Sequence, residues 1–148
     1  MKNLILFIIT CFGLIGCAGH SMTRMTDAVA LSALDQDVLV EQWGIRAERM
    51  MLTGAGNLID FRYWVVDPIK AAKAVSPKIK PMLVDEKTGM LKDVPMPANI
   101  GALRNTGKNL QKGRKYFVLF NNPGGNIHRG DKVTVMMGDY KLEHIEVQ

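Results

Sequence analysis

The fold is decided by residues 58–66, LIDFRYWVV, in which apolar and polar side chains alternate. A period of two is typical of an antiparallel strand that has one buried face. Asp60 and Arg62 share the exposed face, two residues apart, and are expected to pair with each other at the surface. The buried face is expected to carry Ile59, Phe61, Tyr63 and Val65.

The segments on both sides of this strand extend the pattern. Gly44 to Thr53 is a candidate strand, and the turn signal Gly54–Asn57 after it predicts a hairpin with residues 58–66. Asp67-Pro68 combines an N-cap carboxylate with a proline at the first helical position, so a helix of about two turns is expected to follow it. Ser76-Pro77 should end that helix.

Further strands are predicted along the rest of the chain. Pro81 lies inside one of them, which indicates a sheet edge. Gly138-Asp139 suits a tight hairpin of type II′ or I′. The fold class that follows is all-β: an immunoglobulin-like β-sandwich of about seven strands with one short helix, the alternative being a small barrel. The additional strands span residues 79–84, 90–94, 116–121, 132–137 and 140–147.

The segment before Trp43 is ambiguous. Thr26 or Asp27 could cap a short helix, whereas Val38-Leu39-Val40 resembles the start of a strand. We therefore divide the chain into a signal peptide (1–16), a tether with a lead-in segment (17–42) and a β-sandwich domain (43–148).

The domain from Trp43 to Gln148 is similar to a class of small bacterial periplasmic proteins whose activity is uncharacterised. The similarity lies in residues 56–63, 66–71, 116–121 and 130–135. It implies a sandwich built for contact rather than for chemistry.

The N-terminus resembles a targeting signal. Lys2 precedes an apolar run of eleven residues, Leu4 to Leu14, which is too short to cross a membrane and typical of a secretory signal. Leu14-Ile15-Gly16-Cys17 resembles the lipobox of bacterial lipoproteins. The resemblance implies lipid modification of Cys17 after cleavage between Gly16 and Cys17, and two or more acyl chains give stable membrane residence. Ala18 favours sorting to the outer membrane.

Composition excludes several classes of protein. The chain has 148 residues, of which 47% are hydrophobic and 22% charged, so it is neither disordered nor long enough for two domains. Two cysteines exclude a disulfide framework. No serine sits in a Gly-x-Ser-x-Gly elbow, and His128 and His144 have no local acid–nucleophile pattern. We expect no enzymatic activity and no cofactor.

Nine methionines follow Met1 and raise the possibility of a copper carrier, since thioethers suit Cu(I). The adjacent pairs Met50/Met51 and Met136/Met137 argue against it. Neighbouring residues on a strand point to opposite faces, so neither pair can clamp one ion. No metal ligands are assigned, and a periplasmic carrier using Met and His stays as the alternative function.

The charge pattern carries the main functional signal. The net charge is +5, and no acidic residue lies between Asp93 and Asp131. Pro95 to Gly113 is expected to be a long loop, a kind of segment that is usually functional or mobile, with Met96, Ile100 and Leu103 as candidates to pin its first half. The basic residues of this window are Arg104, Lys108, Lys112, Arg114, Lys115 and Arg129.

These observations predict a lipid-anchored periplasmic binding or scaffolding module, a small accessory subunit of a cell-envelope complex. Its expected partners are the membrane, through the anchor, and an envelope protein. The basic surface suits anionic lipid head groups, lipopolysaccharide phosphates or an acidic partner protein. Nucleic acid and a small-molecule substrate are not expected. The predicted location is the periplasmic face of the outer membrane.

Overall fold

The computed structural model describes residues 33–107 and 109–148. Cys17 and Lys108, both singled out by the sequence, lie outside the described residues. The structure begins with α1 (Ala33–Val38), which continues into a π-helical turn (Leu39–Trp43), and a second helix, α2 (Pro68–Ala74), follows the first hairpin. The strands are β1 (Ile45–Thr53), β2 (Leu58–Val65), β3 (Met82–Asp85), β4 (Leu91–Lys92), β5 (Lys115–Asn121), β6 (Lys132–Met137) and β7 (Tyr140–Glu146).

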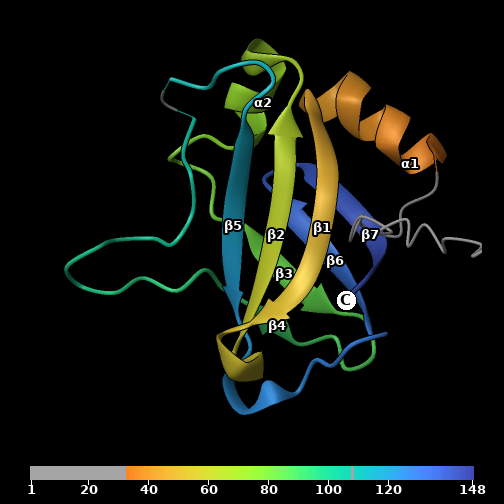
Figure 1. Cartoon of the computed structure of the whole chain (residues 1–148), viewed down its shortest axis with the longest axis vertical. Coiled ribbons are helices and arrows are strands. Elements are labelled where there is room, and N and C mark those ends of the chain that lie inside the picture. The colour runs from red at the N-terminus through yellow and green to blue at the C-terminus, as the bar shows by residue number, and fades with distance from the viewer. Residues whose placement is uncertain (1–32, 108) are drawn as a thin grey trace, which may run out of the picture.

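The strands form two antiparallel sheets. One sheet has the order β1-β2-β5 and the other β4-β3-β6-β7. Figure 1 shows the three-stranded sheet in front of the four-stranded one, with α2 at the upper end of β2 and α1 beside the upper end of β1. The inner faces of both sheets contribute to one hydrophobic core. The prediction of an all-β sandwich with about seven strands is thus confirmed for the described residues, but there are two short helices rather than one.

The alternation in β2 is the one that the sequence predicts. Phe61 lies between Met50 of β1 and Val118 of β5, and all three side chains are buried. Phe120 is buried on the same face of the sheet. On the other face Arg62 donates to Asp60, at 2.8 Å between Nε and Oδ2, so the predicted pair exists. Asp60 is nevertheless only 5% exposed, so the pair is less superficial than expected.

The start of α2 follows the predicted capping pattern. The Asp67 carboxylate accepts hydrogen bonds from the backbone N–H groups of Ile69 (2.9 Å) and Lys70 (3.2 Å). The Gly44 carbonyl receives the N–H groups of Val66 and Asp67. Gly44 has φ +65, and a Cβ there would lie 2.5 Å from the Asp67 carbonyl oxygen, so only glycine fits this approach.

Two local predictions are wrong. Val38-Leu39-Val40 is helical rather than the start of a strand, because Leu39 and Trp43 turn toward the core and are buried there. The Trp43 ring meets Tyr140 edge-on at 5.3 Å between centroids. Pro81 precedes β3 instead of lying inside it, and β3 is an inner strand between β4 and β6.

Candidate functional site

The long segment after β4 lies along the edge of β5. Leu103 accepts a hydrogen bond from Leu119 N–H (3.0 Å), and Asn105 N–H donates to the Phe117 carbonyl (3.0 Å). The Asn105 side-chain oxygen accepts from Phe117 N–H at 2.9 Å. The predicted loop thus exists, but its middle is held by backbone bonds to the sheet.

Arg104 is placed by this pairing. It forms an isolated antiparallel bridge with Val118, and directly opposed residues share one face, so its side chain lies on the core side of the sheet. Its Nη2 donates to the carbonyl oxygens of Ser76 (3.3 Å) and Pro77 (3.2 Å). Arg104 therefore joins the β5 edge to the connection between α2 and β3.

The Arg104 guanidinium is partly desolvated and lacks an acidic partner among the described residues. Its Nη1 is buried and makes no hydrogen bond to any of them. Burial lowers the pKa of Arg104, and the nearby Tyr63 opposes that shift. The Tyr63 hydroxyl is also buried without a hydrogen-bond partner in the described chain, and burial raises its pKa.

Three of the predicted basic residues meet around one cavity of about 520 Å³ at the start of β5. Lys115 is partly neutralised, since it pairs with Glu48 and lies 4.8 Å above the Trp64 ring. Arg114 donates to the Gln111 side chain, and no acid of the described residues faces it. The cavity, called the basic cavity below, is therefore cationic. Its polar lining is Arg104, Asn105, Thr106, Asn109, Arg114 and Lys115.

Lys112 and Arg129, the other described members of the predicted basic set, do not line that cavity. Lys112 lines a neighbouring hollow of about 390 Å³ that also contains Arg46 and Trp64. Arg129 belongs to the segment between β5 and β6, and this segment runs beyond the far end of β5 at the bottom of Figure 1. The five of these residues that the structure describes thus do not form one surface, and they divide between the two ends of the molecule.

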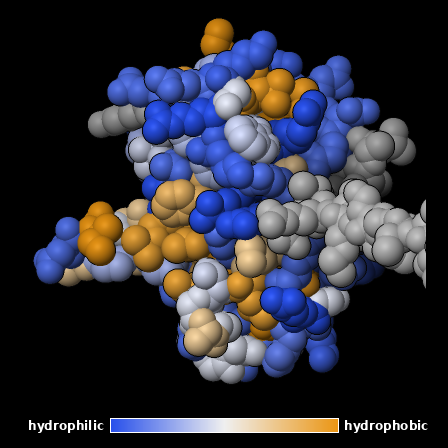
Figure 2. Space-filling model, viewed as in Figure 1, coloured by the Kyte–Doolittle hydropathy of each residue, from blue (hydrophilic) through white to orange (hydrophobic). Residues whose placement is uncertain are grey.

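The first half of the long segment is not pinned in the way the sequence predicts. Met96 is 72% exposed and Ile100 is 75% exposed. The loop that projects beside β5 in Figure 1 carries hydrophobic atoms at the same place in Figure 2. Of these three residues, only Leu103 is partly buried, because its backbone pairs with β5.

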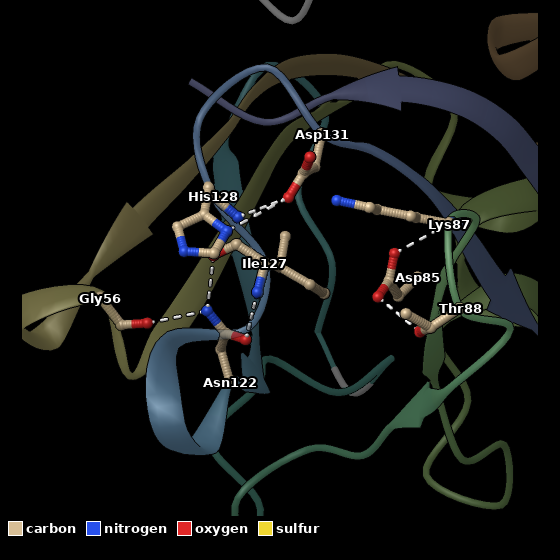
Figure 3. Close-up of polar contacts among 8 residues, drawn as sticks. All are labelled: Gly56, Asp85, Lys87, Thr88, Asn122, Ile127, His128 and Asp131. Atoms are coloured by element: carbon tan, nitrogen blue, oxygen red, sulfur yellow. Dashed lines mark hydrogen bonds and ion pairs between the residues drawn. The ribbon is translucent and has the colours of Figure 1, made fainter.

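The end of the molecule near Arg129 is built from hydrogen-bonded turns (Figure 3). The buried Asn122 amide donates to the carbonyls of Gly56 (2.8 Å) and Ile127 (2.9 Å) and accepts from Ile127 N–H (3.1 Å). The buried Asp85 accepts from Thr88 Oγ1 at 2.6 Å. The hydrogen bonds of these polar groups are made by the backbone and by neighbouring side chains. This pattern is typical of polar residues that stabilise the fold.

The two histidines in the described part of the chain, His128 and His144, also make local contacts in a turn and a bulge. His128 N–H donates to Asp131 at 2.8 Å, and its exposed ring lies 3.6 Å from the same carboxylate. His144 has φ +59 in a bulge of β7, where Glu86 accepts from its backbone N–H (2.8 Å) and lies 2.9 Å from its ring Nδ1. In the described part of the chain, no three His, Cys, Asp or Glu side chains are grouped as a metal site.

The methionine pairs are arranged as the sequence predicts. Met50 and Met137 are fully buried, while Met51 and Met136 lie on the outer faces of their sheets. The strand register also brings together two methionines that are far apart in sequence. Met82 lies directly opposite Met136 on neighbouring strands.

Sequence reasoning missed the residues that complete the basic cavity, above all Asn105, Thr106 and Phe117. They carry no charge and belong to no motif, and only the register between the long segment and β5 brings them together. None of the helices in residues 33–107 and 109–148 is long and apolar enough to span a membrane.

Comparison with protein families, with curated proteins and with solved structures gave no match. The candidate site is a cationic cavity that lies where a segment of chain docks against the edge of a three-stranded sheet.

Proposed function

We propose that this protein is a lipid-anchored binding or scaffolding module on the periplasmic face of the outer membrane, and that it acts as a small subunit of a cell-envelope complex. The anchor rests on the lipobox-like Leu14–Cys17 and on the signal-like run before it. The observation that carries the binding role is the convergence of Arg104, Arg114 and Lys115 on one cavity.

The sandwich is, in this proposal, of the immunoglobulin type. A constant-type immunoglobulin domain pairs strands 1, 2, 5 and 4 in one sheet and strands 3, 6 and 7 in the other. This protein pairs β1, β2 and β5 in one sheet and β4, β3, β6 and β7 in the other. Moving the fourth strand from one sheet to the other converts the first arrangement into the second. Such sandwiches commonly serve recognition, which supports a role in contact.

The proposed partner is an acidic protein. Arg114 and Lys112 are exposed and lie in neighbouring concavities beside Trp64, which is 38% exposed. Aromatic and arginine side chains are enriched where proteins bind one another. A lipid anchor already holds the domain at the membrane, so additional attraction to lipid head groups adds little, whereas an acidic protein partner gains both steering and specificity.

The test compares two charge-matched double variants of the full chain. Lys112→Gln with Arg114→Gln removes one charge at the basic cavity and one at the neighbouring hollow, and Arg129→Gln with Lys132→Gln removes two charges at the opposite end. We expect only the first variant to lose its partners in pulldown from solubilised envelopes, and raised salt to weaken the wild-type interaction because it screens exposed charges. Both variants should keep nearly the wild-type melting temperature. Equal retention of every partner by both variants would refute the binding role.

One observation favours the second candidate, a carrier of Cu(I). Met82 and Met136 are cross-strand neighbours on an outer sheet face, so two thioethers lie side by side. Anaerobic titration with Cu(I) should then show one site in the wild type and none in Met136→Leu, whereas Met51→Leu should bind as the wild type does. Identical binding by all three proteins, or none, rejects the carrier.

A further inference from the structure

A second cavity, of about 480 Å³, lies on the other side of Arg104. It opens between the connection that leads into β3 and the first part of the long segment. Arg104 and Thr106 line both this cavity and the basic cavity. Its apolar wall, from which we call it the apolar cavity, consists of Pro81, Met82, Val94, Met96 and Ala102.

The apolar cavity has the size and the character of a ligand site. Pockets that bind small molecules measure roughly 300–1,000 Å³ and are mostly apolar, with few polar groups that fix orientation. The charged side chains that line it are Lys80, Asp93 and Arg104. Asp93 accepts a hydrogen bond from the Asn121 side chain at 2.7 Å, which engages its carboxylate with β5. Lys80 is exposed at the rim.

Arg104 supplies the polar anchor. Nη2 is used by the Ser76 and Pro77 carbonyls and Nη1 is sealed from solvent, but the guanidinium lines the cavity and has no acidic partner among the described residues. A partly desolvated cation without an anion is costly, so an anion beside the guanidinium is favoured. An apolar wall that ends at an unpaired guanidinium is complementary to a molecule with an aliphatic chain and one anionic head.

We propose that the apolar cavity binds the chain of a single-chain carboxylate amphiphile and that Arg104 holds its head group. The carboxylate pairs with the part of the Arg104 guanidinium that lines the cavity, Lys80 attracts the anion to the rim, and the chain packs against Met82 and Val94. Met96 stands at the mouth with most of its surface in solvent, where bound aliphatic chain would cover it. This site goes beyond the proposed function and depends neither on the lipid anchor nor on an envelope partner.

The probe is sodium dodecanoate, titrated calorimetrically into the full chain below its critical micelle concentration. We expect saturable binding to one site. Shortening the chain from dodecanoate to decanoate and octanoate should weaken binding by about fourfold per methylene removed, because each buried methylene contributes a fixed transfer free energy. Dodecyltrimethylammonium, which has a chain of the same length and a cationic head, should bind at least about tenfold more weakly, since Arg104 repels it.

Two variants of the same loop locate the site. Met96→Glu places a like charge at the mouth of the apolar cavity and should weaken dodecanoate binding by at least about tenfold. Ile100→Glu changes an equally exposed residue that does not line the cavity, and it should bind as the wild type does. Both positions are exposed, so neither variant threatens the fold. Equal binding by the two variants, or equal binding of the cationic probe, overturns the proposal.

Arg104 is tested by Arg104→Lys and Arg104→Gln. The lysine variant keeps the charge and should retain part of the affinity for dodecanoate, whereas the glutamine variant should lose it, with circular dichroism as the check on folding. The Lys112→Gln/Arg114→Gln protein separates this site from the proposed function. If that protein loses its envelope partner and still binds dodecanoate, the two sites are independent. If the wild type binds its partner but not dodecanoate, only the amphiphile site is refuted.

Discussion

The side-chain amide of Gln36 exchanges two hydrogen bonds with the backbone of Ala47, as a neighbouring strand would. Ala47 N–H donates to Gln36 Oε1 at 3.2 Å, and Gln36 Nε2 donates to the Ala47 carbonyl at 3.1 Å. Farther along β1, Gln148 bonds to Met50 and Leu52 in the same way through its backbone. The outer edge of β1 is thereby covered at two points, and covered edges resist pairing with other chains.

Gln36→Ala should therefore uncover part of the β1 edge. We expect a loss of about 1–3 kcal/mol in the free energy of unfolding, because two backbone groups lose their partner. The variant should also self-associate at lower concentration, which size-exclusion chromatography measures. Asp37→Ala, at the exposed neighbouring position, is the control. A Gln36→Ala protein that is as stable and as monomeric as this control would show that the edge is protected by other means.

Phe61→Ala tests the inner face of β2. Phe61 is fully buried, so truncation should cost about 3–5 kcal/mol in chemical denaturation, a large part of the stability of a small domain. Phe117 lies on the outer face of the same sheet and is only half-buried, so Phe117→Ala should cost clearly less. Equal losses would mean that the faces of the sheet are assigned the wrong way round.

Asn122→Ala removes the amide that joins two turns. The variant leaves the Gly56 and Ile127 carbonyls and the Ile127 N–H without their partner, so we expect a loss of about 2–3 kcal/mol. Asn126→Ala should change stability little, because Asn126 is exposed and makes one bond of 3.3 Å. Thermal unfolding of both variants gives the comparison, and similar melting temperatures would contradict it.

Glu86 should make stability depend on pH. Burial favours a higher pKa, but the Thr134 hydroxyl, the His144 ring and N–H and the charge of His144 together hold the pKa of Glu86 below its ordinary 4.5. The unfolded state therefore takes up the proton first as pH falls. Stability from this carboxylate is present above pH 4.5 and is lost as pH drops through the lowered pKa.

Urea unfolding of Glu86→Gln across this range checks the effect. The wild type should exceed the variant in stability at neutral pH, and the difference should shrink on acidification. Thr134→Val removes one hydrogen bond to Glu86 and should give an intermediate pH dependence. Parallel pH profiles for the wild type and Glu86→Gln would rule out this role.

The lipid anchor is tested at Cys17, outside the described residues. Cys17→Ser should abolish lipid labelling and either release the protein from membranes or leave an uncleaved precursor. Cys11→Ser changes the other cysteine, inside the predicted signal peptide, and should behave as the wild type. Normal processing and outer-membrane residence of the Cys17→Ser protein would disprove the lipoprotein assignment.

Local patterns were sufficient for much of the fold. The alternation around Phe61 gives the buried face of β2, and Asp67-Pro68 gives the start of α2, because both depend on neighbours in sequence. The site depends on long-range pairing instead. Arg104 sits in a segment without strand pattern, and its face is set by the bridge to Val118. Gln36 bonds to β1 through its side chain, and a repeating pattern of apolar residues does not predict such a bond.

Charge counting likewise identified the basic residues but not their grouping. Arg114 and Arg129 belong to one acid-free window, yet β5 lies between them and carries them to opposite ends of the sandwich. Lys115 is paired with Glu48, an acid from outside the window that β1 brings alongside through the sheet. The order of charges along the sequence shows neither the separation of Arg114 from Arg129 nor the pairing of Lys115 with Glu48.

The amide of Asn122 has a consequence for the chemical ageing of the protein. Asparagine deamidates when the backbone nitrogen of the next residue attacks its side chain, and the product aspartate would turn acceptor oxygens toward the Gly56 and Ile127 carbonyls, which now accept from this amide. The next residue is Pro123, which has no N–H to release and is a poor nucleophile for this cyclisation. Deamidation of Asn122 would disturb both turns that its amide joins, and the proline that follows it suppresses this reaction.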